Sequence, residues 1–175
     1  MMLKELFTFS NGKTWNNLDS GNNPIYGSTG IIGYSNKALF SGPNTLIARV
    51  GANCGFLQFV NGNYWVTDNT IIATSKSIII PKYGYYLLGT LGISRLKIGA
   101  AQPLLTIGIL NSIETSVHSI EHQHHIVNTI GSIDDLIENY QSQIYNICAL
   151  LERALDVYKN KCFISEYNPI IINLP

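Results

Sequence analysis

One apolar stripe constrains this chain more than any other feature, and it runs through the stretch from Ser119 to Lys161. Apolar residues recur there at alternating spacings of four and three without a break, which is the heptad seam of a coiled coil. Ser119 is suited to cap the helix, and Gly131 is its one weak position, costing about 1 kcal/mol against alanine. The ten stripe positions are Ile126, Ile130, Ile133, Ile137, Tyr140, Ile144, Ile147, Leu151, Ala154 and Tyr158.

A helix over residues 119–161 would be about 60 Å long, whereas the average helix has only about 11 residues. One small domain cannot cover a narrow seam of that length, and the sequence contains no second long helical pattern. An uncovered seam would also promote aggregation. The stripe therefore predicts a homodimer, in which a second copy of the chain packs against it.

Length and charge divide the chain into two parts. A chain of 175 residues with 46% hydrophobic residues is long enough for one domain with a buried core and an extension. Residues 1–118 hold eight basic and four acidic residues, a net charge of +4, whereas residues 119–175 hold three basic and seven acidic residues, a net charge of −4. The positive part is a mild indication of an anionic ligand, although a scatter of charges without meaning explains it as well.

Cysteine usage and the N-terminus bear on the compartment. The three cysteines, Cys54, Cys148 and Cys162, are odd in number, widely spaced and without a CxxC motif. The first residues do not lead into an apolar signal segment, and no apolar run approaches the length of a membrane span. We therefore expect a reduced, cytoplasmic protein without a membrane segment.

The first 118 residues have the texture of a β-rich domain. Residues 3–9 suit a short helix or a strand, and short β-type runs punctuated by glycine follow from Ile25. These runs cover residues 25–26, 31–34, 45–50, 56–60, 64–67 and 70–74. The dipeptide Asn61-Gly62 lies between two of them and predicts a β-hairpin. Residues 83–93 look helical, and residues 99–113 suit a strand or a loop.

The predicted fold class is therefore α+β: a β-rich globular domain over residues 1–118 and one long coiled-coil helix over residues 119–161. Residues 162–175 form a tail, since Pro169 and Pro175 cannot continue a helix.

Three groups of residues suggest chemistry, and each has a simpler explanation. His118, His122, His124 and His125 cluster where the helix begins, and the pairs His118/His122 and His122/His125 have the spacing to place two imidazoles on one helix face. A third ligand beside such a pair at a familiar spacing is missing, so a polar, solvated or DNA-adjacent helix start explains the histidines better. Cys54 lies in a glycine-rich loop without a visible base, which favours a small buried cysteine over a nucleophile. The glycines of residues 26–34 lack a GK[ST] ending and indicate tight turns.

Four segments in a fixed order carry a resemblance to a known family. They are YGSTGIIGY at residues 26–34, ARVGANCG at 48–55, YWVTDNT at 64–70 and GAAQP at 99–103. Gln123 follows where the family's long helix usually opens with glutamine. In these residues the chain resembles the specificity subunit of type I restriction-modification systems, with one target-recognition domain and its trailing helix.

The resemblance has departures. Thr29 stands where the family often has asparagine, Val50 stands where it often has lysine, and Leu104 and Thr106 stand where it often has glycine and asparagine. The change at Val50 puts one phosphate contact in doubt. A usual member has two recognition domains and two helices, so this sequence looks like a half subunit.

The resemblance implies a non-enzymatic, sequence-reading role on double-stranded DNA. It implies recruitment of methylation subunits, and of a restriction subunit where one exists, with S-adenosylmethionine bound by the methylation subunit and no cofactor in this chain. The sequence agrees, because residues 168–171 read Asn-Pro-Ile-Ile and carry only the first half of the adenine-methylation motif. Polar side chains on loops and β-edges are the candidates for DNA contact. They are Lys13, Asn16, Ser28, Thr29, Lys37, Arg49, Asn53, Asn63, Tyr64, Asn69, Lys76 and Lys97.

For each candidate, a solvated loop residue is an equally good explanation, and Arg49 and Asp68 suit a structural ion pair. Two rival functions stay open. A structural or interaction protein, with a β-rich head on a coiled-coil stalk, fits the stripe and the neutral total charge. A nuclease or transferase would need clustered acids, a metal set or a cofactor loop, none of which the sequence shows.

Overall fold

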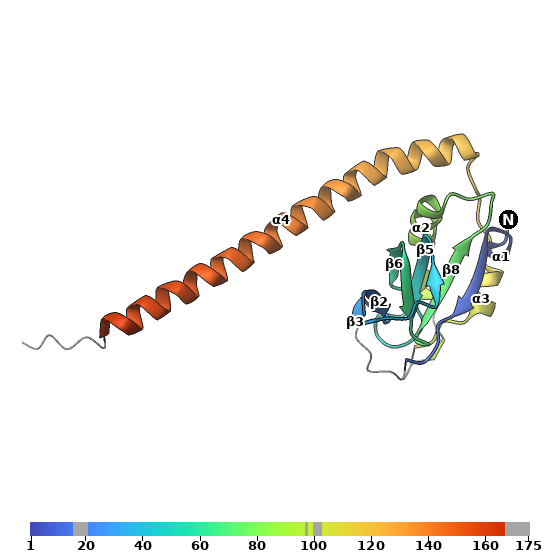
Figure 1. The fold of residues 1–175 in the computed structure, drawn as a ribbon. Coiled ribbons are helices and arrows are strands. Elements are labelled where there is room, and N and C mark those ends of the chain that lie inside the picture. Colours follow the sequence, from blue (N-terminus) through green and yellow to red (C-terminus); the bar gives the residue numbers. More distant parts are fainter. Residues whose placement is uncertain (16–20, 97, 100–102, 167–175) are drawn as a thin grey trace, which may run out of the picture. The chain divides into compact units, whose positions relative to one another are not determined.

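The computed structural model describes residues 1–15, 21–96, 98–99 and 103–166, with side chains described up to Tyr158 in the final helix. The chain divides into two compact units, Met1–Thr129 and the residues from Ile130 onward, and each is described by itself. The first unit holds two four-stranded sheets and several short helices (Figure 1). The final helix, α4 (Ile120–Glu166), begins in the first unit and continues into the second.

The first sheet has the order β1-β8-β5-β6, and all its neighbouring strands are antiparallel. Its strands are β1 (Phe7–Asn11), β8 (Thr70–Ser75), β5 (Asn44–Ala48) and β6 (Leu57–Val60). All five residues of β5 are buried, because both faces of this sheet are covered. Ile47 and Ile71 pack in a core with the helices, whereas Leu46 and Ile72 pack in a second core with the other sheet. This alternation follows the two-residue period of a strand.

The second sheet has the order β3-β2-β7-β4. Its strands are β3 (Ile31–Ser35), β2 (Asn23–Tyr26), β7 (Asn63–Val66) and β4 (Phe40–Ser41). The β2–β7 pair is parallel, and the β2–β3 and β4–β7 pairs are antiparallel. Tyr64 and Val66 of β7 join Leu46 and Ile72 of the first sheet in one cluster of buried side chains. The two sheets therefore share a core.

The predicted hairpin at Asn61-Gly62 is wrong. β6 pairs with β5, whereas β7 pairs with β2 and β4, so the two strands that flank the turn belong to different sheets. The turn itself forms, since Gly62 has a φ of 89° and its N–H donates to Oδ1 of Asn61 at 2.9 Å. Val60 before the turn and Tyr64 after it are both buried in the shared core. Burial of these two side chains carries the chain from one sheet to the other.

Short helices cover the outer face of the first sheet. They are α1 (Leu3–Leu6), α2 (Pro81–Thr90), a 3-10 turn η1 (Ile93–Arg95) and α3 (Ile107–Ser112). Both alternatives for residues 3–9 occur, because α1 leads directly into β1. Helix α2 confirms the helical interpretation for residues 83–90, and it begins with a proline, where a missing N–H costs nothing. Helix α3 is a correction, since residues 99–113 suggested a strand or loop; Thr106 caps it by accepting a hydrogen bond from the N–H of Ile109 at 3.2 Å.

Helix α4 begins beside the predicted cap. Oγ of Ser119 accepts a long hydrogen bond from the N–H of His122 at 3.4 Å. The helix runs to Glu166, so the predicted tail is wrong for residues 162–166, while the prolines of the tail lie outside the described residues. The sheets followed by one long helix confirm the predicted α+β fold class. Among the described residues, no helix has both the length and the apolarity needed to cross a membrane.

Candidate nucleic-acid interface and apolar helix face

One end of the first sheet brings together three of the predicted DNA contacts, Lys13, Arg49 and Asn69, which we call the Arg49 cluster. Arg49 follows β5 and Asn69 precedes β8, and the N–H of Arg49 donates to the carbonyl of Asn69 at 2.9 Å. The guanidinium Nη1 of Arg49 reaches the main-chain carbonyl of Asp68 at 3.4 Å, and the Asp68 carboxylate accepts a hydrogen bond from Thr14 at 3.0 Å. Arg49 thus meets the Asp68 backbone and not the carboxylate that a structural ion pair would use.

Lys13 follows β1 of the first sheet, and its main chain is held by β7 of the second sheet. Its N–H donates to the carbonyl of Val66 at 2.9 Å, and its carbonyl accepts from the indole Nε1 of Trp65 at 3.1 Å. Trp15 meets Trp65 edge to face, with ring centroids 4.9 Å apart. The backbone at Lys13 is therefore held, while its side chain is exposed. The Arg49 cluster presents a lysine, an arginine and an amide on fixed loops, which are suitable groups for phosphate and base-edge contacts.

Other candidates lie on several loops. Ser28 and Thr29 are in the turn between β2 and β3, where the carbonyl of Ser28 accepts from Nε2 of Gln58 at 3.3 Å. Lys37 is exposed between β3 and β4, and its N–H donates to Oγ of Ser35 at 2.8 Å. Asn53 and Asn63 are exposed as well, in a turn after β5 and at the start of β7. Of these candidates, Asn53 lies in the same loop as Arg49, between β5 and β6, whereas Ser28, Thr29, Lys37 and Asn63 lie on other connections or strands.

Two candidates have a position that argues against DNA contact. Tyr64 is fully buried, and its hydroxyl accepts a hydrogen bond from Nδ2 of Asn44 at 2.6 Å. Tyr64 is therefore a core residue, and its proposed role as a base contact is wrong; burial raises the pKa of its phenol. Lys76 follows the far end of β8 from Asn69, and its Nζ donates to the carbonyl of Lys4 at 2.7 Å. Asn16 and Lys97 lie outside the described residues.

The residues considered for other chemistry have structural roles. Cys54 is buried, and its thiol donates to the carbonyl of Arg49 at 3.1 Å, as expected for a small cysteine in a turn. Nδ1 of His118 is 2.8 Å from the hydroxyl of Tyr83, and Nδ1 of His122 is 2.8 Å from Oγ of Ser119. Within the described part of the chain, no group of three or more metal-ligating side chains comes together.

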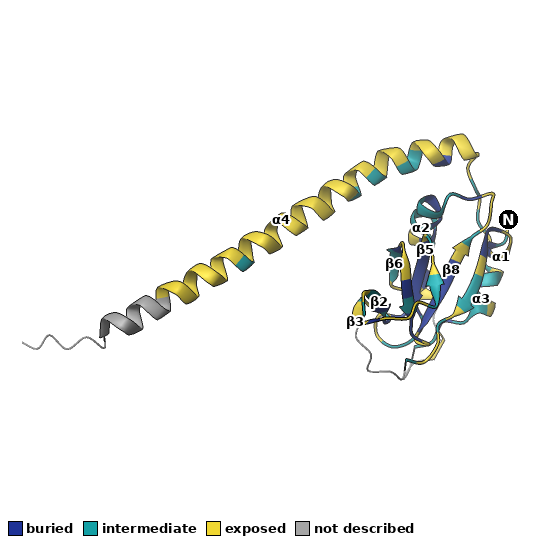
Figure 2. Ribbon diagram, in the orientation of Figure 1, coloured by how far each residue is buried: buried dark blue, intermediate teal, exposed yellow. Residues whose placement is uncertain are grey.

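The apolar stripe changes character along α4. Ile126 is half-buried and packs against the core of the first unit, so part of its apolar surface is covered within the chain itself. Ile130 is 39% exposed and Ala154 is also exposed. The seven other stripe residues are between 48 and 67% exposed. These seven are Ile133, Ile137, Tyr140, Ile144, Ile147, Leu151 and Tyr158. Most of α4 is coloured as exposed in Figure 2.

Further apolar residues flank the stripe, and the sequence interpretation missed them. Leu136, Leu150 and Val157 each precede a stripe residue directly and are 53, 62 and 55% exposed. In heptad terms they share the position g when Ile130 is placed at a, and their presence makes the apolar face wider than a two-position seam. Counting the flanking positions, as well as the seam, would have found this face in the sequence.

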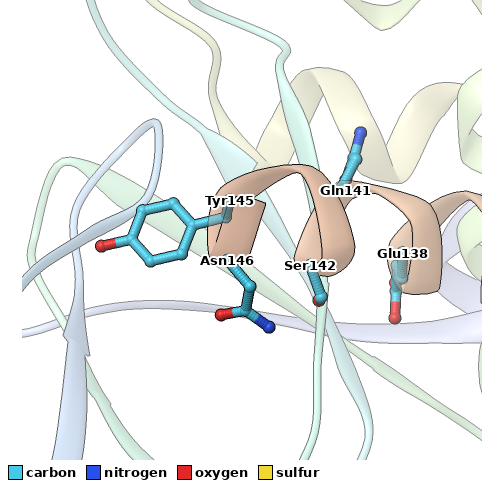
Figure 3. Close-up of a pocket in the computed structure, with 5 residues that line it drawn as sticks. All are labelled: Glu138, Gln141, Ser142, Tyr145 and Asn146. Atoms are coloured by element: carbon cyan, nitrogen blue, oxygen red, sulfur yellow. The ribbon is translucent and has the colours of Figure 1, made fainter. Parts of the chain in front are cut away.

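A hollow on α4 lies away from the stripe and is lined by Glu138, Gln141, Ser142, Tyr145 and Asn146 (Figure 3). All five residues are exposed and come from consecutive turns of this one helix. Side chains on a single helix surface do not enclose a ligand, because a binding pocket requires walls on several sides. The hollow therefore belongs to the solvated face of the helix.

The features above define a class of protein, a β-rich two-sheet domain followed by one long helix with an exposed apolar face. A family model described as "Type I restriction modification DNA specificity domain" matches residues 1–147. The chain therefore belongs to the family of type I restriction-modification DNA specificity domains, as the four segments predicted. Members of this family are specificity subunits and are not catalytic.

A curated relative is similar to this chain in sequence, and several solved structures share its fold. The type I restriction enzyme EcoprrI specificity subunit of Escherichia coli is 28% identical over 128 residues, which are 72% of this chain and 32% of that protein. A type I S subunit from M. genitalium has the same fold, with a TM-score of 0.73 at 20% identity, over 81% of this chain and 40% of its own. An HsdS subunit from Thermoanaerobacter tengcongensis matches with a TM-score of 0.61 at 14% identity, over 79% and 37%.

A third structure shows the same relation of lengths. It is described as the structural basis of complex assembly and conformational transition of the type I R-M system, and it matches with a TM-score of 0.63 at 16% identity. The match covers 93% of this chain and 45% of that one. The chain thus spans about a third of the curated relative's length and less than half of each of these structures.

Proposed function

We propose that this chain is a DNA sequence-recognition subunit of a type I restriction-modification complex and that it works as a homodimer through α4. The β-rich domain that precedes α4, which we call the head, reads one half of a bipartite target on double-stranded DNA in each copy of the chain. The dimer recruits methylation subunits, and a restriction subunit where one exists. The observation that supports this most strongly is the family match over residues 1–147, combined with a long exposed apolar face on the following helix.

The flanking residues of the stripe favour an antiparallel pair. In a parallel pair each g position lies beside an e position of the partner, whereas in an antiparallel pair g lies beside g and e beside e. The g positions of α4 after Ile130 are Leu136, Gln143, Leu150 and Val157, and the e positions are Asp134, Gln141, Cys148 and Leu155. Three of the four g positions are large apolar residues against one of the four e positions, so an antiparallel pair places the more apolar flanks against each other. Leu136 and Leu150 are also equally far from residue 143, so a pair centred there would bring each Leu136 beside the partner's Leu150.

DNA contact falls to the exposed loops of the head. An antiparallel pair carries its heads at opposite ends, so one duplex is touched at two places with untouched base pairs between them. Two-fold symmetry of the protein then requires inverted, identical half-sites. We assign the Arg49 cluster, together with Lys37, to the contacts with phosphates and base edges, and affinity should fall steeply with salt.

Catalysis and cofactor binding are assigned to the partners. We propose that the methylation subunit binds S-adenosylmethionine and transfers the methyl group, while this chain selects the site. The chain on its own should then transfer no methyl group to DNA and should not cleave it.

The test is the methylome of cells that carry this chain together with its methylation subunit. A gapped motif with two identical, inverted halves is the expected result. A continuous motif, or a gapped motif with two unrelated halves, would contradict the homodimer even though the family assignment stands.

The alternative is a structural or interaction protein, which the exposed helix face alone would also suit. A gel shift with genomic DNA at low salt separates the two functions. The recognition subunit is expected to bind DNA, alone or with the methylation subunit, and to release it as salt is raised. Failure to bind DNA in both states would favour the structural function.

A further inference from the structure

Gln123 is the one fully buried polar side chain in the described part of α4, with 1% of its surface exposed. Its side-chain oxygen accepts a hydrogen bond from the N–H of Ile80 at 2.9 Å. Its side-chain nitrogen donates to the carbonyl of Ile78 at 3.2 Å and to the carbonyl of His118 at 3.0 Å. Both ends of the amide are thus satisfied by backbone groups, which is what a buried polar group requires.

These three backbone groups come from two places in the first unit. Ile78 and Ile80 lie in the connection from β8 to α2, and Ile80 is the N-cap residue of α2. His118 lies just before α4 begins. One side chain therefore ties the first turn of α4 to the entry of α2 and to the chain that leads into α4.

The same face of α4 is also held by packing. Ile126 and Val127 follow Gln123 by three and four residues, which places them on one helix face, and both pack against the core of the first unit. Together, the amide and the two apolar side chains hold the first turns of α4 in both position and rotation. An apolar contact alone allows sliding, whereas three directed hydrogen bonds define a register.

We propose that Gln123 is a positioning residue that sets the number of base pairs between the two half-sites. This inference rests on the proposed function. The middle of the stripe is about 30 Å along the helix from Gln123, so a tilt of about 6° at the root would move the helix there by about 3 Å. A tilt moves the helix sideways, so it changes the separation of the half-sites only by the component of that displacement along the duplex. Both copies of the chain in the dimer contribute such a component, and in an arrangement where the helix crosses the duplex obliquely the two together reach the rise of one base pair, about 3.4 Å. A loosened root would therefore let the dimer accept gaps that are one base pair longer or shorter.

The test compares Gln123→Met with His124→Ala in the full chain. Methionine keeps the length and volume of the side chain, but its thioether is only a weak acceptor for the N–H of Ile80 and cannot donate to the two carbonyls. His124 is the exposed neighbour of Gln123 on α4, so its variant controls for a change at this end of the helix. Each protein is combined with the methylation subunit and given DNAs that have the same two half-sites, taken from the methylome, at a series of gap lengths.

Wild-type protein and His124→Ala are expected to methylate one gap length strongly. Gln123→Met is expected to lose this preference severalfold for gaps one base pair longer or shorter, while substitutions in the half-sites still abolish methylation. A purely structural role would lower methylation at every gap alike, and that result would overturn the inference.

Hydrogen exchange supplies a readout that needs no DNA. The amide of Ile80 is expected to exchange faster in Gln123→Met than in the wild type, and unchanged exchange would also overturn the inference. Should Gln123→Met fail to fold, Gln123→Asn keeps the amide but shortens its reach, and it is measured in the same way. If the wild type itself shows no gapped motif, the proposed function fails with the inference; a normal wild-type motif with an unchanged gap preference in the variant contradicts the inference alone.

Discussion

Residues 120–129 and the residues of α4 from Ile130 onward share one sequence pattern but differ in what surrounds it. In the first stretch Gln123 is buried and Ile126 packs against the core of the first unit. In the second stretch the large apolar residues of the same stripe are between 39 and 67% exposed. The 4-3 repeat is continuous across the boundary, so it predicts only an apolar helix face that is suited to burial. Which partner covers it, the chain's own core or another molecule, depends on tertiary structure.

The largest effect is expected from charges in the exposed stretch. Changing Ile137 and Ile144 together to Asp would place unpaired carboxylates in the proposed dimer seam, where burying a charge is very costly. We expect the dimer to be lost, giving monomers or aggregates in sedimentation experiments, while the tertiary circular dichroism of the first unit is retained. A wild-type protein that sediments as a clean monomer at micromolar concentration would contradict the dimer itself.

A matched pair of truncations separates the two stretches. Ile126→Ala removes a half-buried side chain from the core of the first unit and should lower its free energy of unfolding by about 1–2 kcal/mol. Ile133→Ala removes an isoleucine that is 54% exposed, so it should leave the stability of that unit unchanged and weaken dimerisation instead. Chemical denaturation and dilution experiments on both variants measure the two effects. Equal effects of the two variants on unit stability would remove the distinction between the stretches.

The smallest expected effect is on how the stability of the first unit depends on pH. Burial raises the pKa of Tyr64 above its ordinary value of 10.0, with a nearby tyrosine, Tyr26, adding to the shift and the hydrogen bond from Asn44 opposing it. The neutral phenol is therefore favoured in the folded state, and its stabilising contribution is complete below about pH 10 and lost as the pH rises through the raised pKa.

The variant Tyr64→Phe should cost about 1 kcal/mol at neutral pH, because it loses the hydrogen bond with Asn44. It should also lose less stability than the wild type when the pH is raised above 10, since it has no phenol to ionise at this position. Denaturant titrations at pH 8 and above pH 10 measure the difference. Identical pH dependence in the two proteins would show that Tyr64 is not the group responsible.

Periodicity and local signals predicted most of the architecture, and they failed where contacts distant in sequence decide the outcome. The long helix, the β-rich first unit and helix α2 could be read from spacing, because each of them is a local pattern. The turn at Asn61-Gly62 was also correct as a turn, but the pairing of β6 and β7 was not. A dipeptide specifies a reversal of the chain, whereas the burial of Val60 and Tyr64 selects which sheet each strand enters.

For the candidate interface, too, residue type predicted some of the contacts, while others depended on contacts that are distant in the sequence. Residue type suggested Arg49 and Asn69 as DNA contacts, but only the pairing of β5 with β8 brings them to one end of a sheet. Tyr64 was misjudged because a tyrosine in a β-run has the same composition signal whether its strand face is buried or exposed. The role of Gln123 was visible only as a family resemblance, since its three partners lie up to 45 residues away in the sequence.

The two-sided burial of β5 has a consequence for how such a protein changes over time. Its residues alternate between two cores, so nearly any substitution in this strand disturbs the packing of one core or the other. The turns at Ser28 and Thr29 and at Lys37 carry side chains that neither core uses. Substitutions can therefore accumulate in these turns while the central strands stay constant. If the proposed function holds, a library that seeks a new DNA sequence preference should randomise the turns and leave β5 and β8 unchanged.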